Sequence, residues 1–213
     1  MALWLDTAIV LIVFLGLFIL SSQRLGTIIK TFALQSFVLS IIPFLLHNQI
    51  SVHSIVISLG TLILKVCFVP YVLFWAIRHV SIRREEKPII SYGKTILLGG
   101  VFIIGSFILS RTLILPGEHF SNLLVPASFS IIMMGFLLLM SRTKAITQVV
   151  GYLVMENGIF LFAFSLVGAM PFLVEMGILL DVFVGIFIMG IVVNHISETF
   201  EHPYSTILKN LKD

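Results

Sequence analysis

Three ionisable side chains interrupt long apolar segments of the sequence: Lys65, Glu156 and Asp181. Counted at helical rise from the nearest polar edge, Glu156 lies about 18 Å, Asp181 roughly 13 Å and Lys65 roughly 20 Å inside its segment. A charge at the bilayer centre costs at least about 2.5–3.5 kcal/mol on insertion scales. Such groups face a protein interior or a hydrated cavity, where they pair or exchange protons. We therefore predict that these three residues form a proton pathway near the middle of a membrane.

Three further polar residues are secondary candidates, and one structural alternative competes with the pathway. Lys30 lies about one and a half turns into its helix and can reach the cytoplasmic edge by snorkelling. Gln35 either belongs to the pathway or bridges helices, and Glu175 is either an outer gate or an interfacial residue. In the alternative, Lys65 and Asp181 form a buried ion pair that holds the helices together. Such a pair adds little net stability, because desolvation offsets the attraction.

Other catalytic chemistry has no candidate residues in this chain. Cys67, the single cysteine, cannot form an internal disulfide and is interpreted as a small buried apolar residue within a span. The six histidines are scattered and do not cluster with cysteines or carboxylates at metal-ligand spacing. A glycine-rich phosphate loop and a nucleophile with a neighbouring base are also missing from the sequence. We therefore expect no catalytic residue, no metal and no cofactor in this chain.

The segments that carry these residues are those of an integral membrane protein. Of the 213 residues, 59% are hydrophobic and 11% charged, whereas soluble domains have about 45–50% and about 25%. The mean hydropathy is +1.15. Crossing the hydrocarbon takes about 20 apolar residues in a helix. The sequence therefore predicts an all-α integral membrane fold of about seven transmembrane helices, at Leu3–Leu20, Leu25–Leu46, Val52–Ile77, Lys94–Ile114, Leu123–Met140, Ala145–Val167 and Phe172–His195.

The distribution of basic residues predicts the orientation. Because cytoplasmic connections are enriched in lysine and arginine, the basic side of the predicted topology is placed in the cytoplasm. The opposite side carries only Arg111. We expect a multi-pass protein of the cell membrane, with the N-terminus outside and residues 196–213 as a cytoplasmic tail. The first span is predicted to be uncleaved, because Asp6 stands where a signal peptide has basic residues. The basic side holds Arg24, Arg78, Arg83, Arg84, Lys87, Arg142, Lys144, Lys209 and Lys212.

Residues 1–213 are predicted to form one membrane domain that contains a duplicated three-helix unit. The first copy covers residues 1–78 and the second covers 122–195, and a linker helix at 94–114 joins them. Alignment of the copies places Gln35 on Glu156 and Lys65 on Asp181. The alternative is that apolar helices resemble one another by chance.

Several segments resemble the hydrogenase-4 component E family, and the match spans nearly the whole chain. The segments are Met155-Glu156-Asn157-Gly158, Leu173 to Asp181, Ala33 to Ser36 and Lys65 to Pro70. The second half is also similar to the K-type subunit of complex I and to the Mrp antiporter C subunit. Those subunits have two membrane glutamates in consecutive helices. Glu156 matches the first, and the shorter Asp181 stands in place of the second.

The resemblance implies a non-catalytic membrane subunit of a hydrogenase-4-like, complex I-related oxidoreductase that moves protons or sodium. Its partners would be other membrane subunits, the lipid bilayer and a peripheral redox arm that carries the nickel–iron and iron–sulfur centres. Nucleic acid is not an expected partner, because the net charge of +3 is spread over the connections. A subunit of a multisubunit cation/proton antiporter and a structural scaffold remain as alternatives. The coupled ion, the electron donor and the direction of flow stay open.

Overall fold

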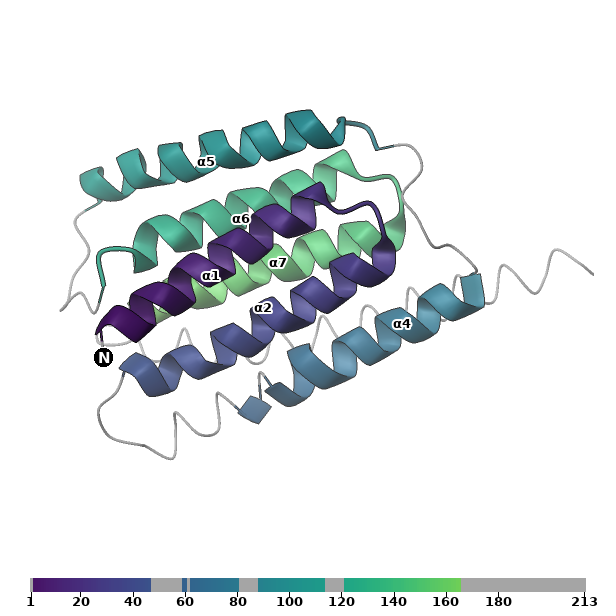
Figure 1. Cartoon of the computed structure of the whole chain (residues 1–213), viewed down its shortest axis with the longest axis horizontal. Coiled ribbons are helices and arrows are strands. Elements are labelled where there is room, and N and C mark those ends of the chain that lie inside the picture. The colour runs from purple at the N-terminus through teal and green to yellow at the C-terminus, as the bar shows by residue number, and fades with distance from the viewer. Residues whose placement is uncertain (1, 47–58, 61, 81–87, 114–120, 166–213) are drawn as a thin grey trace, which may run out of the picture.

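The regular elements of the described chain are all helices. The computed structural model describes residues 2–46, 59–60, 62–80, 88–113 and 121–165 (Figure 1). Helices α1, α2, α5, α6 and α7 are long and apolar enough to cross a membrane, which confirms an all-helical, multi-pass membrane protein. The elements are α1 (Ala2–Ser21), α2 (Leu25–Leu46), the π-helix η1 (Leu62–Phe68), α4 (Val69–Val80), α5 (Tyr92–Thr112), α6 (Leu124–Ser141) and α7 (Ala145–Ser165).

The five long helices occupy the first, second, fourth, fifth and sixth predicted spans, with ends that differ by a few residues. Within the third predicted span, Val52–Ile77, the structure describes η1 and then α4. The seventh, Phe172–His195, lies outside the described residues, as do Glu175, Asp181 and the tail at 196–213. The total of seven spans, the repeat and the orientation therefore stay predictions.

Helices α6 and α7 pack against each other more extensively than any other pair in the described chain. Their interface is built from glycines, because a Cβ atom at Gly135 would lie 2.6 Å from the Met155 Cα atom. A Cβ atom at Gly151 or Gly158 would likewise lie 2.7 Å from a backbone nitrogen of α6. Small residues allow helix backbones to approach closely in a membrane, where dispersion contributes strongly to helix association. The α6–α7 pair therefore holds the polar side chains of α7 in fixed positions.

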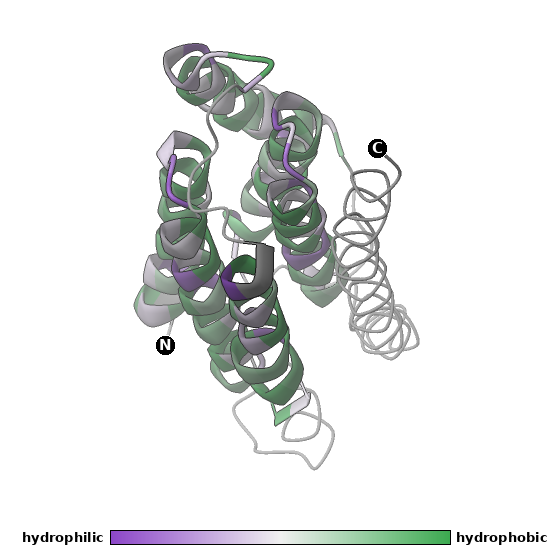
Figure 2. Ribbon diagram, turned by 90° about the vertical axis from the view of Figure 1, so that its right-hand side faces the viewer, coloured by the Kyte–Doolittle hydropathy of each residue, from purple (hydrophilic) through white to green (hydrophobic). Residues whose placement is uncertain are grey.

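Helices α1, α2 and α5 pack against this pair, and α4 packs against α2 and η1. Helix α1 contacts α2, α5 and α6, whereas α2 contacts α7, η1 and α4 (Figure 1). Hydrophobic residues predominate along the helices (Figure 2), and many large apolar side chains of α1 and α5 are exposed, among them Phe14, Leu97 and Ile104. In a bilayer such surfaces contact lipid or neighbouring subunits without penalty, because lipid tails are as apolar as these side chains.

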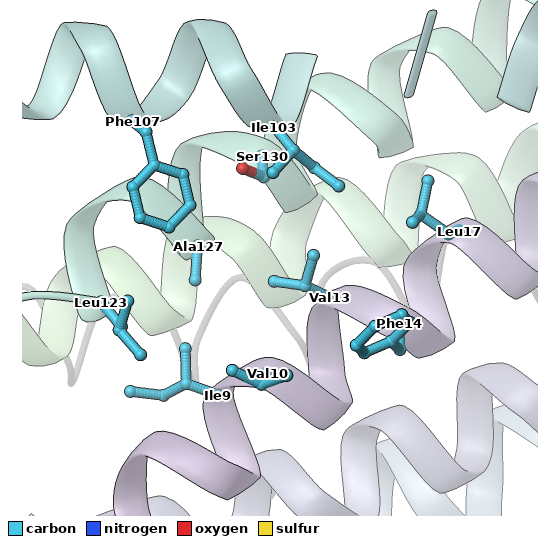
Figure 3. A pocket seen from close by; sticks show the side chains of 10 residues that line it. All are labelled: Ile9, Val10, Val13, Phe14, Leu17, Ile103, Phe107, Leu123, Ala127 and Ser130. Carbon is cyan, nitrogen blue, oxygen red and sulfur yellow. The ribbon is translucent and has the colours of Figure 1, made fainter. Parts of the chain in front are cut away.

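An apolar cavity of ≈ 200 Å³ lies between α1, α5 and α6 (Figure 3). Its single hydroxyl belongs to Ser130, and that hydroxyl donates a hydrogen bond to the Pro126 carbonyl oxygen at 2.7 Å. The cavity therefore offers no group for proton or ion chemistry. Its lining residues are Ile9, Val10, Val13, Phe14, Leu17, Ile103, Phe107, Leu123, Ala127 and Ser130.

The interpretation of Cys67 as a buried residue is wrong for the described chain, because its side chain is exposed on η1. Lys65, two positions earlier, is buried. Residues two apart on a helix do not face the same neighbours. The burial of Lys65 therefore turns Cys67 outward.

Candidate functional site

Two of the three predicted pathway residues meet inside the helix bundle. The Lys65 Nζ atom lies 3.7 Å from the Glu156 Oε2 atom, and the two side chains are 1% and 4% exposed. Lys65 belongs to η1 and Glu156 to α7. The third residue, Asp181, lies outside the described residues. Lys65 and Glu156 therefore form a buried pair of ionisable groups at ion-pair distance.

Lys65 is presented by a π-helical segment rather than by a regular α-helix. Pro70 follows in the first turn of α4, and it has no N–H to donate to the Val66 carbonyl group. The regular hydrogen-bond ladder therefore cannot run unbroken from η1 into α4. π-Helical turns in proteins are found frequently at functional sites.

Asn157 connects this pair to two more helices. The Lys65 Nζ atom donates to the Asn157 Oδ1 atom at 3.2 Å. The Asn157 Nδ2 atom donates to the Gln35 Oε1 atom at 3.3 Å and to the Ser36 Oγ atom at 3.1 Å. The Gln35 Nε2 atom donates to the Ile12 carbonyl oxygen on α1 at 3.1 Å. We call the five side chains of Gln35, Ser36, Lys65, Glu156 and Asn157 the polar cluster; all of them are buried.

The polar cluster lies halfway along the helices that form it. Gln35 is near the middle of α2, Asn157 is near the middle of α7, and Ile12 is near the middle of α1. These three helices are long enough to cross a membrane. The cluster therefore lies at the depth where an ionisable group costs most and where such groups mark ion or proton pathways.

Two aromatic rings, those of Phe160 and Phe164, pack next to Lys65 of the polar cluster. The Lys65 Nζ atom lies 5.5 Å from the centroid of the Phe160 ring, which is within the range of a cation–π contact. Phe160 in turn packs edge-on against Phe164, with 4.8 Å between ring centroids. In such a low-dielectric environment, electrostatic interactions are stronger than in water. The electrostatic interaction between Lys65 and Glu156 is therefore strong.

The secondary candidates separate in the structure. Gln35 joins the polar cluster and bridges α1, α2 and α7. Lys30 has an exposed side chain on α2 and makes none of the contacts that define the cluster. Glu175 lies outside the described residues. Sequence reasoning missed Asn157 and Ser36, because uncharged polar residues in an apolar helix give a weaker signal than charges do. The proximity of Asn157 to Glu156 was the signal available.

A third buried ionisable residue of the described chain, Arg142, lies between the end of α6 and the start of α7. Its side chain is fully buried, although the sequence placed it with the basic residues of a cytoplasmic connection. The Arg142 Nη2 atom donates to the Leu20 carbonyl oxygen at 2.6 Å, and the guanidinium carbon lies 4.2 Å from the centroid of the Tyr92 ring. Arg142 thus ties the α6–α7 connection to the end of α1 and the start of α5.

Comparison with known proteins finds relatives whose similarity extends over most of the chain. The chain is 25% identical over 185 residues to hydrogenase-4 component E of Escherichia coli, which covers 86% of each protein. It is 23% identical over 193 residues to an uncharacterized protein of Mycobacterium tuberculosis, which covers 90% of this chain and 88% of that protein. Neither a family model nor a solved structure matches the chain. The similarity to hydrogenase-4 component E supports a family relationship between that protein and this chain.

Proposed function

We propose that this chain is a non-catalytic membrane subunit of a hydrogenase-4-like redox complex, and that its polar cluster carries part of the translocation of protons or sodium. The observation that carries the proposal is the buried Lys65–Glu156 pair at the middle of membrane-length helices. The similarity to hydrogenase-4 component E over 86% of the chain supports membership of such a complex.

The pair has the chemistry that proton transfer requires. Proximity of a carboxylate and an ammonium favours both charges, whereas burial disfavours them. These opposed effects mean that a change in hydration or in a neighbouring charge shifts the proton occupancy of Glu156. When Glu156 takes up a proton, the Lys65 ammonium keeps the Asn157 amide oxygen as an acceptor. Asp181 on the predicted following span would be the next carboxylate along the pathway.

The redox chemistry would belong to other subunits. Iron–sulfur clusters are held by several cysteine thiolates, and this chain has one cysteine. The expected partners are other membrane subunits and a peripheral arm that carries the nickel–iron and iron–sulfur centres. In this arrangement the N-terminus would face outward and the C-terminal tail would face the cytoplasm.

The test is charge removal at Glu156 within the native complex. The Glu156→Gln variant keeps the shape of the side chain but cannot titrate. We expect the complex to assemble on native gels. We expect the number of protons taken up into inverted vesicles per redox turnover to fall at least about tenfold, because the amide cannot take up and release a proton. The matched control is Lys30→Gln, which removes an exposed charge outside the polar cluster and should change neither quantity. Normal uptake by an assembled Glu156→Gln complex would refute the pathway.

The nature of the complex needs a separate measurement. Purification of the native assembly, followed by mass spectrometry of the co-purifying chains, should find hydrogenase large and small subunits. A set of antiporter subunits without a redox arm would instead identify a cation/proton antiporter. Loss of assembly in Glu156→Gln with no measurable conduction phenotype in assembled Lys65 variants would favour the structural scaffold.

A further inference from the structure

Asn157 is the residue through which the parts of the polar cluster are connected. Its amide contacts Lys65 on η1 and both Gln35 and Ser36 on α2. Its side chain is completely buried. Removing it would therefore disconnect the ammonium of η1 from α2 without removing any charge.

The orientation of these amides is fixed by the chemistry of Lys65. An ammonium only donates, so the Asn157 atom that faces it must be the carbonyl oxygen. The Asn157 Nδ2 atom then faces Gln35, which must present its own oxygen. The Gln35 Nε2 atom is left to donate to the Ile12 carbonyl oxygen. Reversal of either amide would set donor against donor or acceptor against acceptor, so the chain from Lys65 to Ile12 has one direction.

Two contacts of the Lys65 ammonium, one with Asn157 and one with Glu156, differ in length. The Lys65 Nζ atom is 3.2 Å from the Asn157 Oδ1 atom and 3.7 Å from the Glu156 Oε2 atom. The first is a hydrogen bond, whereas the second is an ion-pair distance beyond hydrogen-bond reach. Asn157 therefore anchors the ammonium beside the carboxylate rather than in direct hydrogen bonding to that oxygen.

We propose that Asn157 is a positioning residue of the ion pathway: it anchors the Lys65 ammonium to α2 and thereby sets its separation from Glu156. This inference rests on the proposed function of the Lys65–Glu156 pair. The anchor keeps a neutral acceptor on Lys65 in both protonation states of Glu156. The carboxyl group can then gain and lose its proton while the ammonium stays in place.

The Asn157→Leu variant tests the anchor, because leucine keeps the branching at Cγ and removes both polar atoms. Without the amide, the Lys65 ammonium moves onto Glu156 and the pair becomes directly hydrogen-bonded. A direct hydrogen bond favours the charged carboxylate, so proton uptake by Glu156 is suppressed. The Ser40→Ala variant is the matched control, since it removes a buried hydroxyl of α2 that lies outside the polar cluster and donates to the Phe37 carbonyl oxygen.

The measurements use the native complex in inverted vesicles, with assembly checked on native gels. We expect Asn157→Leu to lower proton uptake per redox turnover on the order of tenfold, the lower end of what losing an orienting hydrogen-bond partner costs at metal sites. Ser40→Ala should stay within about twofold of the native complex, because this hydroxyl bonds a backbone oxygen of its own helix rather than the polar cluster. Infrared difference spectra should show that the band of the protonated Glu156 carboxyl, assigned by its loss in Glu156→Gln, weakens in Asn157→Leu.

The outcomes separate this inference from the proposed function. Normal uptake in an assembled Asn157→Leu complex overturns the positioning role, as does reduced uptake with an unchanged carboxyl band. Normal uptake in Glu156→Gln overturns the proposed function itself. If Asn157→Leu does not assemble, Asn157→Gln decides, because it keeps the amide but places it one methylene farther from the α7 backbone and so changes the position of the Lys65 ammonium. Reduced uptake with a changed carboxyl band in that variant supports the anchor, and normal uptake overturns it.

Discussion

Helix α7 is buried by two different kinds of contact. Toward α6, Gly151 and Gly158 bring the backbones of the two helices into close contact. Toward α2 and η1, Glu156 and Asn157 meet the amide, hydroxyl and ammonium groups of the polar cluster. The contact with α6 depends on the lack of side-chain atoms at the glycines. The contact with α2 and η1 depends on specific polar atoms of Glu156 and Asn157.

This difference teaches how a chain made largely of apolar helices can hold charges in place. Close backbone packing holds α7 against α6 and gains van der Waals contact between the two helices. The fixed helix then presents its polar residues at a defined height and rotation. We call the α6–α7 contact at Gly135, Gly151 and Gly158 the glycine surface. The glycine surface should determine the stability of the fold through steric fit. The polar cluster should determine ion movement through charge and hydrogen bonding.

The largest stability effect is expected from breaking the ion pair on one side only. Lys65→Met removes the cation next to Glu156, and loss of one partner of a buried pair costs about 3–5 kcal/mol. We expect a clear fall in the thermal unfolding midpoint of the purified complex in detergent. The double variant Lys65→Met with Glu156→Gln should recover most of that loss, because no charge is then left buried alone. If the single and double variants had equally low unfolding midpoints, packing rather than charge pairing would stabilise the polar cluster.

The glycine surface should respond to a single added methyl group. Gly135→Ala places a Cβ atom against the Met155 backbone nitrogen and 2.6 Å from the Met155 Cα atom. Backbone atoms cannot rotate away, so the helices must separate, at the cost of overpacking, about 1–3 kcal/mol or more. The same thermal measurement checks this value. Gly100→Ala is the control on α5, where an added Cβ meets nothing within 4 Å. If the two substitutions lowered the unfolding midpoint equally, the close packing of α6 against α7 would not be what makes Gly135 sensitive to an added methyl group.

The smallest effect is expected at Arg142, a buried charge that is not part of either α7 surface. Tyr92→Leu removes the ring under the guanidinium, a cation–π contact of about 0.5–2 kcal/mol. Tyr92→Phe keeps the ring and should be closer to the native complex in thermal stability. Proton uptake should be unchanged in Tyr92→Leu once the complex is assembled. A large loss of uptake would mean that charges at the helix ends take part in conduction together with the polar cluster.

The sequence by itself determined the positions of the five membrane-length helices of the described chain, and it singled out Lys65 and Glu156. Both results follow from local composition. A segment of about 20 apolar residues must satisfy its backbone groups internally, and in lipid an α-helix does so within one segment. An ionisable residue in such a segment stands out without knowledge of its neighbours, because its cost comes from the bilayer.

Only the tertiary structure decided which side chains meet. The hydrogen bond from Lys65 to Asn157 joins residues 92 positions apart, and the sequence carried no information on the relative rotation of their helices. Arg142 appeared in the sequence as one basic residue of a connection, yet it is buried against Leu20 and Tyr92. A helix that is apolar on every side has no polar face to fix its rotation in lipid. That rotation is therefore set by glycine contacts and polar pairs, which form only when helices distant in the sequence pack together.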